Sequence, residues 1–354
     1  MEMNFITVGK RRIGAGAPAY IIAEMSANHA GSMENAKEII FAAKESGADC
    51  IKLQTYTPDT ITMNCSSEYF QIASGTWAKE NLYELYQKAY TPWEWQAELK
   101  ETAARAGIDF LSTPFDCTAV DFLEEIGLEF YKIGSFELVD IPLLKYVAQT
   151  HKPIIMSTGM GTEEEIREAV GTVRAAGCSE LVLLRCQSVY PARPETMRLA
   201  VMKDMAEKFG VPVGLSDHSV GSLMAVAAVM SGASVIEKHF CLSRKIKNPD
   251  SSFSMEPEEF AAMVRDIRTA EQAVGEAEYD PAGEEQDYRR LRKSIFAVRD
   301  IEEGEAFTAE NIRVIRPGYG LHPRYYEALS GRHAACAVRR GTPLCAEHVK
   351  ERLE

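Results

Sequence analysis

The sequence lacks any run of apolar residues long enough to cross a lipid bilayer. Its first residues, MEMNFITVGKRRIG, also lack the apolar core and small-residue cleavage site of a secretory signal. Basic residues are scarce, with 39 Lys and Arg against 52 Asp and Glu and a net charge of −13. Because nucleic acids and anionic membranes bind surfaces rich in Lys and Arg, we expect a cytoplasmic protein with neither as a general partner. A local basic pocket is compatible with this balance.

Closely spaced cysteine pairs are also missing, since no C-x-x-C motif occurs. A disulfide framework or a zinc site would need closer spacing than the sequence has. We therefore expect eight free thiols, buried for the most part, at Cys50, Cys65, Cys117, Cys178, Cys186, Cys241, Cys336 and Cys345.

Short β-branched runs alternate with longer helical patterns along most of the 354 residues. Most of the runs are nearly continuous in apolar residues, which is typical of parallel strands buried on both faces. There are eight of them: Tyr20–Ala23, Cys50–Leu53, Asp109–Leu111, Phe130–Ile133, Pro153–Met156, Leu181–Leu184, Pro212–Leu215 and Ser234–Glu237. Helical patterns lie between them at Met33–Ser46, Trp95–Ala106, Thr162–Ala176, Ser222–Ser231 and Glu256–Val274.

Eight strand–helix units over residues 1–275 predict a (β/α)8 TIM barrel. The alternative is a doubly wound open sheet, which usually has a glycine-rich phosphate loop after its first strand, where this chain has EMSANHAG. The connection over residues 55–92 is unusually long, and we expect it to be functional. After Gly275 the charged, turn-rich residues 276–293 predict a linker, and residues 294–354 predict a small β-rich domain.

Polar side chains follow every predicted strand, at the end where TIM barrels place catalysis. Lys52, Lys132 and Lys238 in an acidic protein, with Ser and Thr beside them, predict an anion pocket suited to phosphate. His218 and His239 end adjacent strands and predict a site for a divalent first-row metal, with His29 as a possible third participant.

Nine segments then occur in a specific order: IIAEMSANHAGS, IKLQTYTPDT, STPFD, YKIGSFE, IIMSTGM, SVYPA, GLSDHSVG, VIEKHF and IRPGYGLHP. In this order, and over almost the whole chain, they resemble the sialic acid synthase family. The resemblance implies a barrel followed by an antifreeze-like (SAF) domain. It also implies a transferase that forms a carbon–carbon bond between phosphoenolpyruvate and an N-acylated amino sugar, releasing phosphate.

Within that family, EMSANHAG, KLQTYTPDT, AYTPWEW and RPGYGLHP are most similar to the pseudaminic acid synthase branch. The sugar implied is 2,4-diacetamido-2,4,6-trideoxy-L-altrose, and the alternatives are an N-acetylneuraminate or a legionaminate synthase. More distant alternatives are a Schiff-base aldolase and a non-catalytic sugar-binding protein. Two positions depart from the family pattern, since Ala30 and Ser188 each stand where Asn is usual.

The resemblance also assigns roles to single residues. Glu24 matches an acid at the reacting centre, and His218 and His239 match ligands of a divalent metal, preferably Mn, with Co or Mg as alternatives. The phosphoenolpyruvate positions are Lys52, Thr113, Lys132, Ser135, Ser157 and Ser216. The sugar positions are Gln54, Glu137, Tyr190, Asp250 and Arg316. Because the family's equivalent of Arg316 reaches a partner subunit's site, a domain-swapped homodimer is implied.

Four aromatic residues occur in and just after the long connection. They are Tyr83, Tyr86, Tyr90 and Trp93. We expect them to pack on a methyl and an acetamide of the sugar, and the alternative is that they form the small core of the connection itself.

Overall fold

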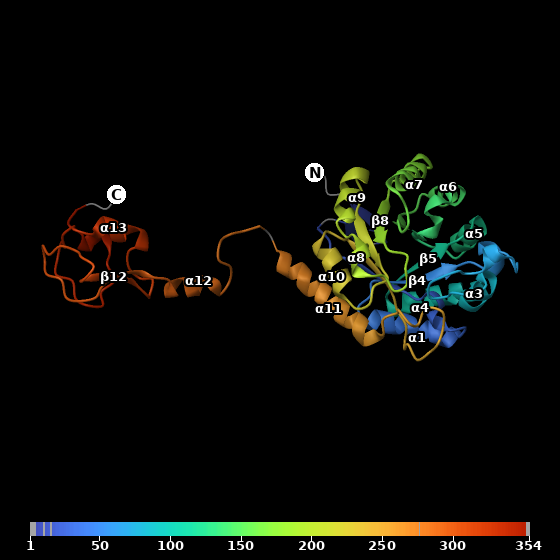
Figure 1. Ribbon diagram of the computed structural model, residues 1–354, viewed down its shortest axis with the longest axis horizontal. Helices are drawn as coiled ribbons and strands as arrows, with labels where there is room; N and C mark the ends of the chain where they lie inside the picture. Colours follow the sequence, from blue (N-terminus) through green and yellow to red (C-terminus); the bar gives the residue numbers. More distant parts are fainter. Residues whose placement is uncertain (1–4, 10, 15, 276, 352–354) are drawn as a thin grey trace. The chain divides into compact units, whose positions relative to one another are not determined.

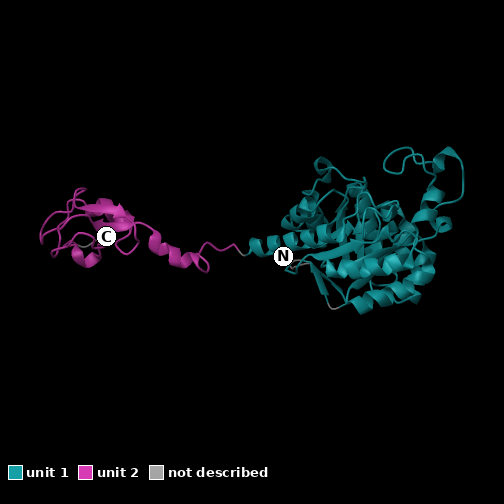
Figure 2. Cartoon of the chain, turned by 90° about the horizontal axis from the view of Figure 1, so that it is seen from below, with its two compact units in different colours: residues 1–275 teal, residues 276–354 magenta. Residues whose placement is uncertain are grey.

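The computed structural model describes residues 5–9, 11–14, 16–275 and 277–351. The chain divides into two compact units, residues 1–275 and 276–354, which Figure 2 shows in separate colours. Each unit has a hydrophobic core of its own. None of the helices in the described ranges is long and apolar enough to span a membrane.

The first unit is a closed barrel of eight parallel strands, which confirms the predicted fold. Its strands are β3 (Tyr20–Glu24), β4 (Cys50–Thr55), β5 (Asp109–Pro114), β6 (Tyr131–Ile133), β7 (Ile154–Ser157), β8 (Leu181–Cys186), β9 (Val213–Asp217) and β10 (Val235–His239). They pair in chain order, and β10 closes the barrel on β3 with Val235 opposite Tyr20 and His239 opposite Glu24. All eight predicted strands are therefore present.

Helices surround the strands, as Figure 1 shows. They are α1 (Met33–Glu45), α4 (Trp93–Ala106), α5 (Cys117–Glu125), α6 (Ile141–Ala148), α7 (Glu163–Ala175), α8 (Pro194–Met197), α9 (Val201–Phe209), α10 (Leu223–Met230) and α11 (Pro257–Val274). The predicted helix over Thr162–Ala176 is present as α7, and Thr162 and Glu165 form a reciprocal capping box at its start. Our sequence reading did not predict α5, α6, α8 and α9.

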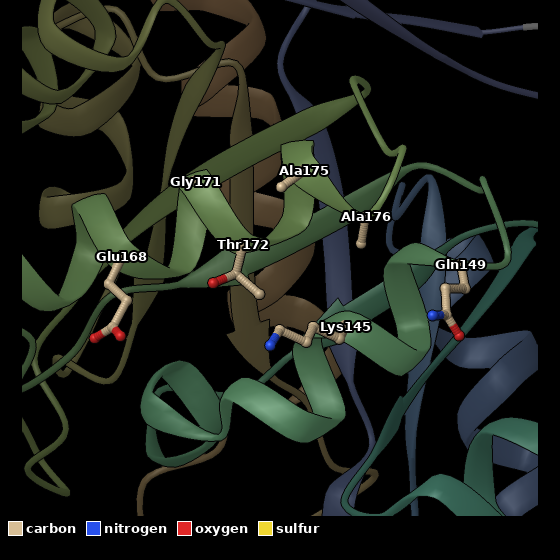
Figure 3. A pocket seen from close by; sticks show the side chains of 7 residues that line it. All are labelled: Lys145, Gln149, Glu168, Gly171, Thr172, Ala175 and Ala176. Atoms are coloured by element: carbon tan, nitrogen blue, oxygen red, sulfur yellow. The ribbon is translucent and has the colours of Figure 1, made fainter.

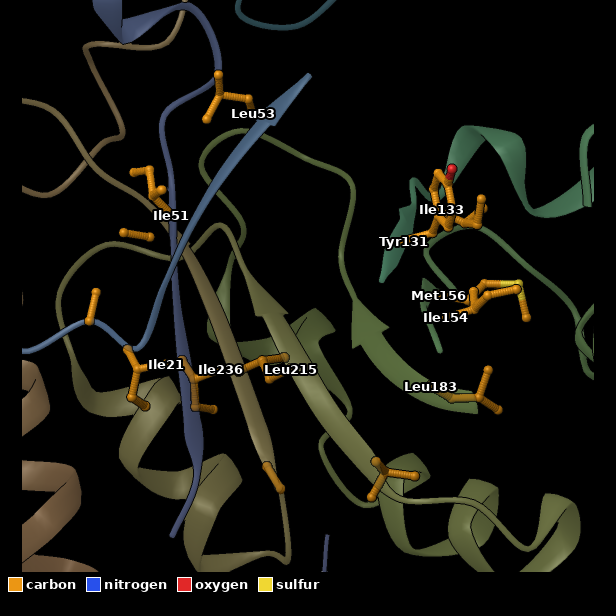
Figure 4. Packing of buried hydrophobic residues seen from close by; sticks show 14 of the residues in the cluster. Ile21, Ile51, Leu53, Tyr131, Ile133, Ile154, Met156, Leu183, Leu215 and Ile236 are labelled. Carbon is orange, nitrogen blue, oxygen red and sulfur yellow. The ribbon is translucent and has the colours of Figure 1, made fainter. Parts of the chain in front are cut away.

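Alternation along each strand separates two layers of side chains. On β10, Val235 belongs to the cluster inside the barrel, whereas Ile236 belongs to the cluster between strands and helices. Figure 4 labels side chains of this outer layer, among them Ile21, Ile51 and Leu215. Because successive residues of a strand face opposite sides, the same alternation decides which polar residues at the strand ends face the barrel interior.

An antiparallel hairpin of β1 (Phe5–Val8) and β2 (Arg11–Gly14), absent from our prediction, packs against the amino-terminal ends of the strands. Its Ile6, Val8 and Ile13 are buried in the inner cluster. Glu180, just before β8, accepts a hydrogen bond from the backbone N–H of Thr7 at 3.0 Å. The hairpin therefore covers the end of the barrel opposite the predicted active site.

The long connection after β4 contains α2 (Pro58–Ile61), η2 (Glu68–Phe70) and α3 (Leu82–Ala89). Between η2 and α3, an antiparallel bridge joins Gln71 to Asn81. Backbone bonds between Ile72 and Glu80 at 2.9 Å, and between Lys79 and Ile72 at 2.8 Å, continue it. Residues 72–80 therefore form an ordered turn, which we call the 72–80 turn.

The second unit is built mainly of turns around a two-stranded antiparallel sheet of β11 (Ser294–Ala297) and β12 (Ile312–Ile315). Its core includes Ile295, Phe307 and Leu344. The helical segments of this unit are α12 (Glu285–Tyr288), η4 (Arg289–Leu291), η5 (Pro323–Tyr325), α13 (Tyr326–Leu329) and η6 (Ala346–His348).

Two short 3-10 helices of the first unit follow strands of the barrel. They are η1 (Ser26–His29) after β3 and η3 (Phe136–Val139) after β6.

Candidate active site at the carboxyl ends of the barrel strands

Two of the three predicted pocket lysines face the barrel interior and are buried there. Lys52 Nζ lies 2.5 Å from Glu24 Oε2 and 3.5 Å from Glu237 Oε1. Lys132 Nζ lies 3.8 Å from Glu237 Oε2 and donates to Ser157 Oγ at 2.7 Å. The two ammonium groups thus contact one shared carboxylate, whose attraction offsets part of the free energy that each charge loses on leaving water.

Glu237 is the site residue that our role assignment missed. Ser216 Oγ donates to Glu237 Oε1 at 3.3 Å, in addition to the two lysine contacts. Burial opposes ionisation of this carboxyl, but Lys132 and Lys52 outweigh it and hold its pKa below the usual value. Strand alternation could have identified it, because Glu237 shares a face of β10 with His239.

The other carboxyl of the cluster behaves differently. Burial raises the pKa of Glu24 to about 7, Lys52 works against that rise, and the charge of Glu237 adds to it. Near neutral pH this group can therefore take up or release a proton at small cost. The lysines differ as well, because burial lowers the pKa of Lys132, whereas for Lys52 the two glutamates overcome burial and raise its pKa.

Hydroxyl groups line the same end of the barrel. Thr113 Oγ1 lies 3.4 Å from Lys52 Nζ, on the strand next to it. Ser135 Oγ accepts a hydrogen bond from the backbone N–H of Gly159 at 3.0 Å. With Ser157 and Ser216, these side chains surround the two lysines with donors suited to an anion. The structure thus brings the six predicted phosphoenolpyruvate positions to one end of the barrel.

Lys238 does not join this pocket, so that part of the prediction was wrong. It shares the outer face of β10 with Ile236, where its Nζ lies 2.7 Å from Asp217 Oδ2 and donates to the Ser219 carbonyl at 2.7 Å. Both side chains of the ion pair are almost fully buried. Lys238 is therefore a structural cation between the strands and the helices.

The two histidines that end β9 and β10 lie together. Their ring centroids are 5.4 Å apart. His218 Nδ1 lies 3.1 Å from the Gln187 carbonyl, which can only accept, so the neutral ring keeps its lone pair on Nε2. His239 Nδ1 is buried without a hydrogen-bond partner, and its nearest carboxylate, that of Asp250, is 3.9 Å away. Burial, reinforced by the charge of His218, lowers the pKa of His239 far below its usual value and keeps this ring neutral.

These features fit a divalent metal, because neutral imidazole nitrogens with free lone pairs are its ligands. No group of three or more ligating His, Cys, Asp or Glu side chains is preformed within the described ranges. The protein would therefore supply the two histidines, with other positions left to substrate or water. Cys186 Sγ lies 3.8 Å from His218 Nδ1. Burial lowers the pKa of His218, but Cys186 and other neighbours outweigh it and raise the pKa, which favours a protonated ring and so opposes metal binding by His218.

His29 does not take part, contrary to our suggestion. Its Nε2 lies 3.2 Å from Thr91 Oγ1, and its Nδ1 accepts from the backbone N–H of Gly31 at 3.0 Å. The ring packs edge-on against Trp95. Both ring nitrogens of His29 therefore already have partners, one in the turn after η1 and one just before the start of α4.

The predicted sugar positions in the barrel lie around the histidines and the lysines. Tyr190 contacts His218, with ring centroids 4.1 Å apart, and Asp250 Oδ2 accepts from the backbone N–H of Ala27 at 3.2 Å. Gln54 faces Thr113 across the β4–β5 pair. Glu137 is in η3, and burial raises its pKa to about 7 while its Oε2 has no hydrogen-bond partner.

Arg316 lies in the second unit, directly after β12. Its side chain is exposed, but its backbone is held in place. Ser294 Oγ donates to the Pro317 carbonyl at 2.7 Å, and the Gly318 N–H donates to the Arg290 carbonyl at 2.8 Å. A guanidinium on such a fixed turn is suited to bind a partner outside its own unit.

The alternative interpretation, a small core of the connection itself, holds for Tyr86, whereas Trp93 packs outside the connection against α5. Tyr86 packs against Tyr56 at 5.5 Å, and Trp93 stacks on Phe122 at 5.0 Å. The residue of the connection that reaches the histidine region is Trp77, which contacts Tyr190 at 5.3 Å.

A shallow pocket of about 520 Å³ lies elsewhere, between α6 and α7 (Figure 3). Its polar lining consists of Lys145, Gln149, Glu168 and Thr172, and the rest is Gly171, Ala175 and Ala176. No buried charged group and no hydroxyl cluster of the kind found at the strand ends is among its lining residues. We therefore assign the chemistry to the mouth of the barrel.

The chain is similar to known proteins over most of its length. Residues 39–279 match the NeuB family, and residues 292–350 match the SAF domain. The chain is 44% identical to the pseudaminic acid synthase of Helicobacter pylori, covering 95% of this chain and 99% of that protein. It is 46% identical to the pseudaminic acid synthase of Campylobacter jejuni, covering 92% and 95%. The crystal structure of N-acetylneuraminic acid synthetase from Leptospira borgpetersenii superposes with a TM-score of 0.72 at 30% identity, covering 80% of this chain and 95% of that one.

The different positions of the lysines predict different effects of their removal. Lys238→Met leaves the buried carboxylate of Asp217 uncompensated, and we expect a loss of about 3–5 kcal/mol in the free energy of unfolding, measured in urea. It should leave binding of inorganic phosphate unchanged in titration calorimetry, whereas Lys132→Met should abolish that binding. Lys203→Met, on an exposed side chain, is the control and should leave the unfolding midpoint in place. Loss of phosphate binding in a folded Lys238→Met protein would contradict this assignment.

Proposed function

The chain belongs to the NeuB family, and we propose that it is a pseudaminic acid synthase. In this reaction phosphoenolpyruvate condenses with open-chain 2,4-diacetamido-2,4,6-trideoxy-L-altrose to give a nine-carbon 2-keto sugar acid and phosphate. The observation that carries the proposal is the pair of buried lysines at the barrel mouth. Hydroxyl groups surround these lysines, and two histidines that could bind a metal in their neutral form lie next to them. Two relatives that carry this name share 44% and 46% of their residues with the chain.

The lysines and hydroxyls would bind phosphoenolpyruvate. Its carboxylate and phosphate carry negative charge through the whole reaction, so fixed cations and donors stabilise them without reorganisation. Lys52 and Lys132 would supply the charge, and Thr113, Ser157 and Ser216 would supply the hydroxyls. Glu237 would keep the two ammonium groups close together despite their mutual repulsion.

Bond formation would begin with the sugar in its aldehyde form, because only the aldehyde carbon is electrophilic enough to accept the methylene carbon of phosphoenolpyruvate. Attack forms the new carbon–carbon bond and leaves a cationic C2 that still carries phosphate. Water adds to C2, and phosphate departs with cleavage of the bond between C2 and oxygen. The two protons of that water go to the former aldehyde oxygen and to the departing phosphate. Glu24, whose pKa of about 7 suits proton exchange, would accept the proton of that water or stabilise the positive C2.

A divalent ion, when bound by His218 and His239, would supply Lewis acidity at the aldehyde oxygen. Two observations support this role: the Nδ1 of His218 lies against the Gln187 carbonyl, which leaves the Nε2 lone pair for an ion, and His239 Nδ1 has no hydrogen-bond partner. Tyr190 and Phe253, which contact these rings, would limit the access of water.

Phosphate release tests the proposal directly. With phosphoenolpyruvate present, we expect higher kcat/KM for 2,4-diacetamido-2,4,6-trideoxy-L-altrose than for N-acetylmannosamine or the legionaminic precursor, in a coupled phosphate assay. A better kcat/KM with N-acetylmannosamine would reject the assigned sugar within the family. Borohydride with substrate should trap no adduct on Lys132, and a trapped adduct would instead indicate a Schiff-base aldolase.

The metal role gives a separate prediction. Exhaustive chelation should abolish phosphate release, and Mn or Co should restore it. His239→Ala should lower Mn affinity in titration calorimetry by at least tenfold, whereas His29→Ala, whose ring is bonded to Thr91, should leave it unchanged. Full activity after chelation, with no metal found by elemental analysis, would refute the role.

We also propose a homodimer in which each second unit serves the barrel of the other chain. Apolar side chains are exposed on the loops and helix starts after β6, β7, β8 and β9, at the mouth of the barrel: Phe136, Val139, Met160, Val189, Val220 and Leu223. An exposed apolar rim of this kind is typical of an interaction surface. A two-fold arrangement would cover both rims at once and would let Arg316 bind oxygens of the sugar in the partner's site.

Subunit mixing tests that arrangement. Arg316→Ala should reduce turnover and leave the dimer and its metal content intact, and Lys132→Ala should be inactive. Mixed dimers of the two variants should regain activity, because one of their two sites then has both native residues. Lack of recovery in verified mixed dimers, or full activity of a monomer, would contradict the cross-subunit role.

We propose that the protein works in the cytoplasm. All eight cysteines are free thiols in the described structure, which suits a reducing compartment.

A further inference from the structure

The 72–80 turn is attached to two distant loops of the barrel mouth. The Thr76 hydroxyl donates a hydrogen bond to the Tyr190 carbonyl, in the loop after β8. Trp77 Nε1 donates to the Pro249 carbonyl at 2.9 Å, in the loop after β10. These contacts join segments 114 and 172 residues apart in the sequence. The turn therefore spans the mouth from the β4 side to the β8 and β10 sides.

Trp77 completes a wall of three aromatic rings at this point. Its ring centroid lies 5.3 Å from that of Tyr190 and 6.1 Å from that of Phe253, and these two rings are 5.0 Å apart. Tyr190 in turn contacts His218 at 4.1 Å, and Phe253 contacts His239 at 5.1 Å. The wall thus begins at the histidine pair and extends outward to Trp77.

Two of the three rings have no free donor to offer a sugar. The indole N–H of Trp77 is already used by the Pro249 carbonyl, and Phe253 has no polar atom. A hydroxyl placed against them would lose its water without gaining a partner, whereas a methyl group would gain by leaving water. The outer part of the wall therefore favours an apolar substituent.

We propose that Trp77 determines the sugar preference of the enzyme by holding Phe253 and the ring face of Tyr190 as an apolar wall for the methyl group at C6. This inference rests on the proposed function, and it makes Trp77 a positioning residue that acts through two neighbouring rings. The aldehyde carbon reacts next to the histidines, so the wall runs from the reacting end of the sugar toward its far end. A 6-deoxy sugar meets the wall with a methyl, and its 6-hydroxy counterpart meets it with a hydroxymethyl.

The test compares two sugars that differ by one hydroxyl: 2,4-diacetamido-2,4,6-trideoxy-L-altrose and the same compound with the C6 hydroxyl. The native protein should prefer the 6-deoxy sugar by about tenfold to a hundredfold in kcat/KM, since a hydrophobic pocket discriminates by about that much. Trp77→Ala should lower this ratio about tenfold, chiefly through the 6-deoxy sugar. The KM for phosphoenolpyruvate should not change, because its lysines lie in another part of the site.

Two further variants separate positioning from loss of structure. Trp77→Phe keeps a ring against Tyr190 and Phe253 and should retain most of the ratio. Trp93→Ala is the matched control, because this second tryptophan also donates its N–H to a carbonyl, that of Tyr56 at 3.1 Å, but stacks on Phe122 away from the wall. It should lower the unfolding midpoint and leave the ratio unchanged.

The outcomes distinguish this inference from the proposed function. An unchanged ratio in Trp77→Ala, or equal losses with both sugars, would overturn the positioning role while the synthase activity stands. A native protein without preference between the two sugars would do the same. No phosphate release with either sugar would overturn the proposed function and this inference with it.

Discussion

The arrangement of the barrel mouth depends on one buried carboxylate, Glu237, between two buried ammonium groups. Two lysines inside a barrel would repel each other, and each would lose its hydration on folding. Glu237 lies within 4 Å of both, and Glu24 adds a second contact to Lys52. The cluster holds two ammonium groups around one ionised carboxylate in a protein whose net charge is −13, and Glu24, with a pKa of about 7, can become neutral beside them. In the proposed reaction, this cluster would give an acidic protein a place for the anionic phosphoenolpyruvate.

Strand alternation explains how far the sequence could predict this site. Because the barrel interior takes every second residue, Lys52 and Lys132 face inward, each with the opposite orientation to its apolar neighbours Ile51 and Tyr131. The eight strands, the barrel and the meeting of His218 with His239 follow from such local patterns. Lys238 was assigned to the wrong side because we counted polar residues at strand ends without applying the same alternation there.

Other features have no local signal, because they depend on which distant segments meet. Nothing near His29 in the sequence indicates that Thr91 will satisfy its ring nitrogen. Nor does the local sequence reveal that Trp77 faces the site while Trp93 packs outside it, since the neighbours of neither residue indicate what its ring will contact. The hairpin of β1 and β2 was missed for a similar reason. Its few apolar side chains are buried only because they pack on the end of the barrel, a contact that the short strands do not indicate by themselves.

The contacts of the 72–80 turn have a consequence for the order of folding. Trp77 is bonded to Pro249, 172 residues later, and the amino-terminal hairpin is bonded to Glu180, 173 residues after Thr7. During synthesis neither end of the barrel can be completed until most of the first unit has left the ribosome. Until then the inner faces of the early strands are open, and contacts of such long range form slowly. The apolar residues of a nascent chain therefore stay exposed until the last barrel strand and the loop that follows it have emerged.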